Sequence, residues 1–282
     1  MRNKIVRKFL ENKGATIAAA VLLVVVCLSI LAPVVSPYDP LTVNPEHLRL
    51  PPVWSEGGGY EHFLGTDSIG RDVLSRLIHG ARVSLGTGLL VVILSLSFGM
   101  LLGTLAGYFS GWVDSLITRM MDILMSLPSI LLAIVIAAVL GPSLVNGIVA
   151  VSIVALPGFV RVIRAAVMAE KAKLYTDASQ CLGASHFRTM VKHILPNCLA
   201  PVTVQATLGF SDGLLNVAAL GFLGLGAQGA TPEWGLMLAG GKGYMSSNPW
   251  LVTLPGLCIL VVVLCFNILG DGLRDAFDPK TI

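Results

Sequence analysis

Long uncharged runs dominate the hydrophobic pattern of this chain. The stretches 14–38, 83–113 and 123–160 contain no charged side chain and are 25, 31 and 38 residues long. A helix needs about 20 predominantly apolar residues to cross a bilayer, so each of the first two stretches predicts one crossing. The third stretch is too long for one crossing. Gly141 and Pro142 interrupt it, which predicts a tight hairpin between two crossings.

Two more apolar stretches follow, from about Cys198 to Ala219 and within Gly243–Gly270. The pattern therefore predicts an all-α polytopic membrane protein with six transmembrane helices. An even number of crossings places both termini on one side of the membrane. The expected segments are a leading segment 1–14, a first transmembrane helix 15–35, a polar loop 36–82, a transmembrane core 83–271 and a terminal segment 272–282.

The composition agrees with a membrane protein and excludes a soluble domain. The chain is 55% hydrophobic and 12% charged, with a mean hydropathy of +0.81, whereas about 25% of the residues in a soluble domain are charged. The net charge of +3 is too small to indicate a nucleic-acid partner. A basic start and an apolar run resemble a signal peptide, but 25 uncharged residues exceed its apolar region of about 7–15. We therefore expect an uncleaved first span.

The basic residues predict which side of the membrane each loop faces. Cytoplasmic loops carry an excess of lysine and arginine. With a cytoplasmic N-terminus, all but five of the 19 basic residues, Lys280 included, fall on the cytoplasmic side. The five on the outer side are Arg49, Arg71, Arg76, Arg82 and Lys242. We therefore expect cytoplasmic termini, an extracytoplasmic loop 36–82, and a cytoplasmic segment between the fourth and fifth spans.

The chain shows no catalytic signature. The glycines around Lys242 resemble a phosphate-binding loop, but the first glycine and the following Ser or Thr are missing, and there is no HExxH sequence. His47, His62 and His79 share one loop without the spacing of metal ligands, which predicts solvated loop histidines. We expect no enzyme activity, metal or cofactor in this chain. Any transport driven by ATP would then need a partner that hydrolyses it.

Small residues recur every four positions in the second predicted span. Ser95, Gly99, Gly103 and Gly107 share one face of a helix, and small side chains there allow another helix to approach closely. This face is suited to packing inside the bundle or to a dimer interface. We favour packing inside the bundle.

The fifth predicted span carries small and polar residues on one face. Gln205, Gly209, Asp212 and Asn216 are separated by 4, 3 and 4 residues, which places them in a narrow stripe at about 100° per residue. Asp212 is the only formal charge deep inside a predicted span, and such a group usually faces a cavity or a partner. We favour the lining of a cavity over a polar contact with a neighbouring helix.

The segment after the fourth span is polar and helix-like. From Leu174 onward the pattern predicts a short helix, a turn at Gly183 and a second helix reaching Leu195, with Pro196 at the entry to the fifth span. A glycine permits the left-handed backbone that lets two helices meet at an angle. Such an elbow is better suited to docking a soluble partner than an ordinary loop is.

This elbow resembles the EAA loop of permease subunits of binding-protein-dependent ABC importers. The resemblance is carried by DASQCLGASHFRTMVKHILPN and implies an ATPase-coupling loop over 171–197. Asp177 stands where the family has glutamate, Ser179 replaces the second alanine, and His193 replaces isoleucine. Asp177 is expected either to pair with a basic group on the partner or to cap the elbow helix. The residues assigned to the coupling loop are Tyr175, Asp177, Ala178, Ser179, Gly183, Ala184, Leu195 and Pro196.

The resemblance covers nearly the whole chain. FLGTDSIGRDVLSRLIHGARVSL, AALGFLGLGAQGATPEWGLML and NILGDGLRDAFDPK look like the C-type permease of dipeptide/oligopeptide/nickel importers, and most like its dipeptide member. This implies the type I (MetI-like) ABC importer permease fold in a bacterial inner membrane. It also implies a heterodimer with a B-type permease, two ATPase subunits that hold ATP and Mg, and an extracytoplasmic substrate-binding protein. The implied role is half of a pathway for di- or oligopeptides.

Other functions compete with a peptide importer subunit. Related permeases are linked to nickel, glutathione and haem, so the substrate stays open. A self-sufficient channel or secondary transporter would predict more intramembrane charge or repeated broken helices. An assembly or anchoring protein would need no polar stripe in the fifth span.

The outer segment Gly221–Gly235 contains five glycines, which disfavour a continuous helix. We expect an interfacial loop anchored by Trp234, at an outer gate or at the docking site of the binding protein.

Overall fold

The chain folds almost entirely into helices. The computed structural model describes residues 2–277, and within this range the only β contact is an isolated bridge between Thr66 and Asp72. Lys280 and the rest of 278–282 lie outside the described residues. The α-helices are α1 (Arg2–Glu11), α2 (Lys13–Ile30), α3 (Ala32–Val35), α4 (Val73–Phe109), α5 (Gly111–Met125), α6 (Ser129–Leu140), α7 (Leu144–Lys171), α8 (Leu174–Cys181), α9 (His186–Arg188), α10 (Leu199–Phe222), α11 (Trp234–Gly241) and α12 (Trp250–Phe277).

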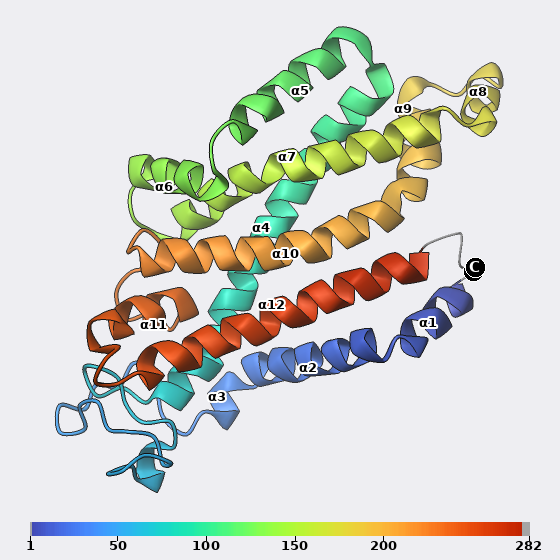
Figure 1. Ribbon diagram of the computed structural model, residues 1–282. Coiled ribbons are helices and arrows are strands. Elements are labelled where there is room, and N and C mark those ends of the chain that lie inside the picture. The colour runs from blue at the N-terminus through green and yellow to red at the C-terminus, as the bar shows by residue number, and fades with distance from the viewer. Residues whose placement is uncertain (1, 278–282) are drawn as a thin grey trace.

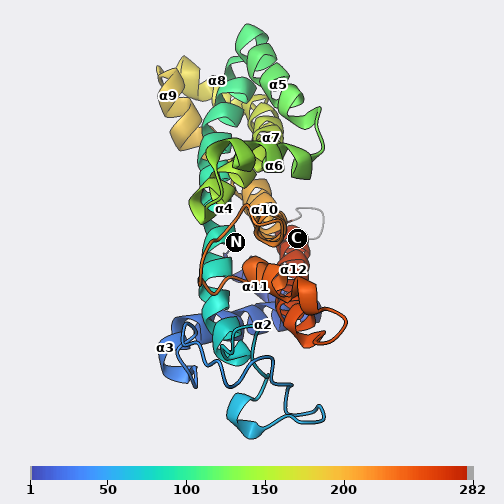
Figure 2. The same cartoon turned by 90° about the vertical axis from the view of Figure 1, so that its left-hand side faces the viewer.

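The long helices lie alongside one another (Figure 1). α2, α12, α10 and α7 follow one another across the molecule, and α4 crosses them obliquely. α1, the end of α12 and the α8–α9 elbow lie at one end of the bundle, while α6, α11 and residues 36–72, here called the outer lobe, lie at the other. Seen from the outer-lobe end, the helices form a narrow slab (Figure 2). The elbow and both described chain ends therefore share one end of the bundle.

Four helices qualify as crossings by length and composition, and a bent pair makes a fifth if it counts as one span. α2, α4, α7 and α12 are long and apolar enough to span a membrane, and α5 with α6 forms a further, bent pair. α10 is not among these helices, because its polar side chains lower its mean hydropathy. Its 24 residues are nevertheless about 36 Å long at 1.5 Å per residue, which exceeds a hydrocarbon core of about 30 Å. The sixth crossing stays a prediction that the length of α10 permits.

The predicted hairpin at Gly141 is confirmed, but the third crossing differs from the expected single helix. α6 ends at Leu140, Gly141 has φ +90°, and α7 begins at Leu144. α6 has only 12 residues, or about 18 Å. It meets α5 at an angle of 90°, immediately after Pro128, because a proline disfavours helical backbone in the residue before it. The third predicted crossing is therefore replaced by a bent pair of helices, which has the form of a broken span or a re-entrant loop.

α4 begins inside the segment expected to be a loop. Its first residue is Val73, and the Asp72 side chain caps it by accepting a hydrogen bond from the Ser75 amide at 2.7 Å. The capped turns carry Arg76 and Arg82, which interrupt the apolar pattern and hid the start of the helix. The outer lobe is thus shorter than the predicted loop.

The small-residue face of α4 packs against α7 of the same chain. A Cβ atom added to Gly99 would lie 2.6 Å from the Cβ of Phe159, and one added to Gly103 would lie 2.9 Å from the Cβ of Ile163. Both distances are too short for any residue but glycine. At the ends of this face, the Ser95 hydroxyl donates a hydrogen bond to the α7 backbone, and Gly107 abuts the α7 backbone as well. The face is thus filled by an internal contact.

Candidate functional site

The polar stripe of α10 opens onto a single cleft, here called the α10 cleft. Gln205, Gly209, Asp212 and Asn216 all line it, and its volume is about 440 Å³. The structure therefore brings together all four residues that the periodicity placed on one face. The facing walls come from α7 and from the α5–α6 joint, with Leu124, Met125, Leu127, Ser129, Val151, Val154, Ala155, Pro157, Gly158 and Phe159.

Two interruptions of helical structure lie at the walls of this cleft. Pro157 stands inside α7, where it cannot donate the usual backbone hydrogen bond. The second interruption is the right-angled joint between α5 and α6. Gly209 admits the buried ring of Phe159, because a Cβ at this position would lie 2.6 Å from the ring carbon Cζ. Neither wall was predicted from the sequence, although Pro157 inside an apolar run is a visible signal of an interrupted helix.

Asp212 presents an unpaired carboxylate to the α10 cleft. Its side chain is exposed and makes no hydrogen bond or ion pair with any residue between 2 and 277. Only its backbone carbonyl is engaged, by the side-chain amide of Asn216 at 2.8 Å. A charge in the middle of a transmembrane helix is costly unless water or a partner solvates it. The carboxylate is therefore available to a ligand that enters the cleft.

The elbow has the predicted angle at Gly183. α8 ends at Cys181, and Gly183 has φ +85°, a conformation that other residues adopt only with strain. The amides of Gly183 and Ala184 donate to the carbonyls of Gln180 and Ser179 and close the turn. Beyond the turn, α9 starts at His186. The elbow projects from the end of the bundle (Figure 1).

The second arm of the elbow is not the single α-helix that was expected. α9 is followed by a π-helical segment, Thr189–Ile194, and a 3₁₀ segment, Leu195–Cys198. Pro196 causes the change, because it donates no backbone hydrogen bond and its ring would clash with the carbonyl four residues earlier. The Asn197 side chain instead donates to the His193 carbonyl at 2.8 Å. The proline therefore sits inside a distorted entry to α10.

Apolar side chains form the protruding surface of the elbow. Leu174, Leu182 and Phe187 are 86%, 89% and 72% exposed. Asp177 lies on α8, is exposed, and has no side-chain partner within residues 2–277. The N-cap of α8 is Lys173, without a side-chain hydrogen bond. Asp177 thus does not cap the elbow helix in this structure.

Tyr108, at the end of α4, joins both arms of the elbow. Its hydroxyl lies 2.8 Å from Nδ1 of His186 and accepts a hydrogen bond from Nε2 of Gln180 at 3.0 Å. Lys171, at the end of α7, donates to the Tyr108 carbonyl at 2.5 Å. The ring is buried, with 3% exposure. No sequence signal marked this residue, because its partners are more than sixty positions away.

Tyr175 forms a second connection between the elbow and the bundle. Its hydroxyl donates to Glu170 at 2.7 Å and accepts from Asn197 at 3.2 Å. Burial, and then the hydrogen bond to Glu170, raise the pKa of the Tyr175 phenol. The hydroxyl therefore stays protonated and keeps donating at neutral pH. Tyr108 and Tyr175 together attach the elbow to α4, α7 and the entry of α10.

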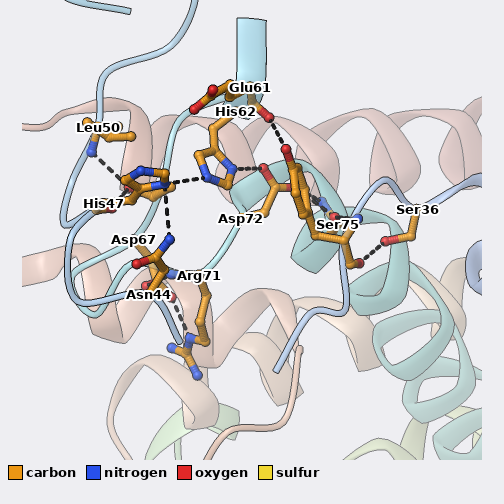
Figure 3. Close-up of polar contacts among 12 residues, drawn as sticks. Ser36, Asn44, His47, Leu50, Glu61, His62, Asp67, Arg71, Asp72 and Ser75 are labelled. Carbon is orange, nitrogen blue, oxygen red and sulfur yellow. Dashed lines mark hydrogen bonds and ion pairs between the residues drawn. The ribbon is translucent and has the colours of Figure 1, made fainter. Parts of the chain in front are cut away.

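The outer lobe contains a chain of polar contacts through His47 and His62. The expectation that the loop histidines are all solvated is therefore wrong for His62. His62 is 8% exposed, and its ring lies 2.9 Å from Asp72 and 3.2 Å from the ring of His47 (Figure 3). Asp72 also accepts bonds from the amide and hydroxyl of Ser75, both at 2.7 Å. The described residues contain no cluster that could hold a metal ion. These side chains tie the lobe to the first turn of α4.

Trp234 is not the interfacial anchor that was expected. It is 2% exposed, its indole N–H donates to the Leu77 carbonyl at 3.1 Å, and its ring fills the space left by Gly80. The preceding residue, Glu233, caps α11 by accepting hydrogen bonds from two backbone amides. The prediction that the glycine-rich segment Gly221–Gly235 is not a continuous helix is confirmed, since α10 ends at Phe222 and α11 begins at Trp234.

Known proteins similar to this chain are transport permeases. The family described as binding-protein-dependent transport system inner membrane component matches residues 99–282, and the N-terminal TM domain of oligopeptide transport permease C matches residues 3–52. The dipeptide transport system permease protein DppC of Haemophilus influenzae is 50% identical and covers 96% of this chain and 92% of its own length. The di/tripeptide permease DppC of Pseudomonas aeruginosa is 53% identical, with coverages of 97% and 90%.

The same fold occurs in a solved importer. The MetNI methionine ABC transporter, in an inward-facing conformation, superposes with a TM-score of 0.60 at 20% identity over 73% of this chain and 98% of that chain. This likeness concerns the fold alone. The helical architecture, the α10 cleft, the elbow and the sequence matches point to one conclusion. The chain belongs to the family of inner membrane components of binding-protein-dependent transport systems and is a multi-pass permease of the inner membrane.

Proposed function

We propose that this chain is one permease subunit of an ATP-driven importer of di- and oligopeptides. The observation that carries the proposal is the α10 cleft, which presents Gln205, Asp212 and Asn216 to one space. A peptide offers amide groups and a positively charged amino terminus. The side-chain amides of Gln205 and Asn216 can hydrogen-bond to the peptide's amide groups. The unpaired carboxylate of Asp212 attracts its positively charged amino terminus. The names of the relatives support peptides over nickel, glutathione or haem as the substrate.

The cleft forms half of the pathway, and a B-type permease supplies the other half. Asp212 is exposed in the isolated chain, and the bundle is a narrow slab (Figure 2). A charged residue on a transmembrane helix cannot face lipid without a large cost. A second permease covering this face resolves the problem, because the two stripes would then enclose a polar channel.

The elbow transmits the movements of two partner ATPases, which bind ATP and Mg. Its apolar tip suits insertion into a groove of such a partner, and Asp177 at its side pairs with a basic group there. Tyr108 and Tyr175 connect the tip to α4, α7 and α10, and these helices carry the α10 cleft and its supports. An extracytoplasmic binding protein delivers peptides at the opposite end of the bundle. The elbow end of the bundle, where α1 and the end of α12 also lie (Figure 1), is cytoplasmic.

Uptake of a labelled dipeptide by the reconstituted complex tests the proposal. We expect Asp212→Leu to abolish most ATP-dependent uptake while the complex still assembles, because the cleft loses its charge. Thr203→Val is the matched control, since Thr203 is an exposed α10 residue that does not line the cleft. Normal uptake by Asp212→Leu would contradict the assignment of the cleft as the pathway.

A further inference from the structure

A second cavity lies in the outer part of the molecule, separate from the α10 cleft. It has a volume of about 160 Å³ and shares no lining residue with that cleft. Asp67, Arg71 and Arg76 form its polar side, where the outer lobe meets α4. Its other side is apolar and comes from α11 and α12. We call this cavity the arginine pocket.

The arginine pocket holds two guanidinium groups and one carboxylate. Asp67 accepts a hydrogen bond from Nε of Arg71 at 2.7 Å and lies 3.6 Å from Nε of Arg76. The side chains of Arg71 and Arg76 are 13% and 3% exposed. Among the described residues that line the pocket, no other acid is present. One positive charge is thus left without a counter-charge in a largely buried space, which is unfavourable unless an anion compensates it.

The hydrogen-bond donors of the two arginines are only partly used. Arg76 engages Nη1 with the carbonyls of Pro40 and Ala230, at 3.1 and 3.3 Å. Its Nη2 and both terminal nitrogens of Arg71 donate to no residue in the described part of the chain. The Asp67 carboxylate is also committed to the amides of Ile69 and Arg71, so it cannot turn to serve them. Figure 3 shows Arg71 directed away from the His47–His62–Asp72 chain.

We propose that the arginine pocket binds a carboxylate that carries a short aliphatic group. Arginine presents planar pairs of N–H donors that match the two oxygens of a carboxylate. The opposite wall contains Leu236, Met237 and Leu251, which suits a few methylene groups. A cavity of about 150 Å³ accommodates a molecule the size of benzene, so the pocket takes a small acid or an acidic side chain rather than a whole oligopeptide. The carboxylate comes from a partner protein's Asp or Glu or from a free organic acid.

Binding of ¹³C-labelled propionate to the transporter complex in nanodiscs tests this site, with NMR line broadening as the readout. We expect saturable binding of propionate and none of propionamide, which has the same shape without the charge. Arg71→Gln should weaken binding roughly tenfold or more, the effect of losing one charge-assisted hydrogen bond. Arg71→Lys keeps the charge but loses the planar pair of N–H donors. Its affinity for propionate should lie between those of the unmodified complex and of Arg71→Gln.

Two further variants separate the site from general damage. Leu236→Phe fills the pocket and leaves both arginines in place, so it should block propionate. Arg82→Gln removes an exposed arginine outside the pocket and should bind propionate as the unmodified complex does. Equal binding of propionamide, no saturable binding of propionate, or unchanged binding in both Arg71→Gln and Leu236→Phe would overturn the proposal.

The source of the carboxylate follows from a competition experiment. If propionate weakens docking of the extracytoplasmic binding protein, and Arg71→Gln does the same, the ligand is an acidic side chain of that protein. If docking is unchanged while propionate binds, the ligand is a free acid. Neither result depends on the α10 cleft, so failure of the peptide pathway and failure of this site are distinguishable.

Discussion

The acidic residues of the outer lobe and those facing the α10 cleft and the elbow tip differ in how they are paired. Asp72 accepts bonds from Ser75 and lies against His62, and Asp67 accepts bonds from two amides and from Arg71. Asp212 and Asp177 have no side-chain partner within residues 2–277. The hydrogen-bonded acids, here called saturated, stabilise the fold, whereas we propose that the unpaired acids interact with substrate or partner. Replacing the first kind should cost stability, and replacing the second kind should cost transport.

The largest loss of stability is expected for Asp72→Ala. This change removes the cap of α4 and leaves the buried His62 without its carboxylate partner. The expected cost is about 2–4 kcal/mol, from one helix cap and one buried hydrogen bond. Thermal unfolding of the purified permease measures it, with Asp177→Ala as the control that should unfold normally. Equal melting temperatures for the two variants would break the distinction between saturated and unpaired acids.

The largest loss of coupling is expected for Gly183→Val. A Cβ at this position meets nothing within 4 Å, so the cost comes from the backbone alone, about 1–3 kcal/mol of local strain. The elbow would change its angle, and we expect substrate-stimulated ATP hydrolysis to be lost while the permease pair still assembles. Gly59→Val, at an equally open position with an extended φ of −125°, is the control. Stimulated hydrolysis that survives in Gly183→Val would remove the elbow from the transmission path.

A smaller effect is expected for Tyr108→Phe, which keeps the ring and removes the hydroxyl. Its two hydrogen bonds are each worth about 0.5–1.5 kcal/mol, so the elbow should loosen without detaching. We expect fewer peptides transported per ATP hydrolysed. In a background of Gln180→Ala and His186→Ala, the same change should have little further effect, because the partners are already gone. Additive losses in that background would show that the hydroxyl acts elsewhere.

The smallest effect concerns Glu233, a buried acid of the saturated kind. Burial raises its pKa above the ordinary value of 4.5, so the folded chain holds the proton more tightly than the unfolded chain. Stability is therefore highest below about 4.5 and falls as the pH rises toward the raised pKa. Glu233→Gln should flatten this dependence, with a change of about 1 kcal/mol or less from the weakened cap. Thermal unfolding of the unmodified permease and of Glu233→Gln, measured from pH 4.5 upward, tests this. If melting temperature plotted against pH gives parallel curves for the two proteins, Glu233 is not the source of the dependence.

The sequence predicted the features that depend on local pattern. The apolar runs located α2, α7, α10 and α12, and the spacing of Gln205 and Asp212 placed both on one face of α10. Gly183 marked its turn because few other residues adopt a positive φ. The family resemblance supplied the fold, which no local pattern contains, and it is the source of the proposed role of the elbow.

Most of the features that the sequence did not reveal depend on distant contacts. The bend between α5 and α6 is local, at Pro128, and was hidden because the uncharged run continues through this residue. His62 appeared to be a loop residue, and only the fold brings it to Asp72. Tyr108 and Arg76 make their contacts with residues far away in the sequence. Such pairings are set by tertiary packing, which a single sequence does not encode in any short motif.

The central claim is that the polar face of α10 lines the peptide pathway, and single cysteines test it most directly. In a complex without its native cysteines, residues 205, 212, 216 and 203 are each replaced by cysteine and exposed to a membrane-impermeant thiol reagent. If this face lines the pathway, positions 205, 212 and 216 react, and a transported dipeptide slows the reaction at positions 205 and 216 in the presence of ATP. Position 203 shows no such protection, and position 212 is tested for reactivity alone because transport needs its carboxylate. Protection at position 203, or none at positions 205 and 216, would contradict the claim.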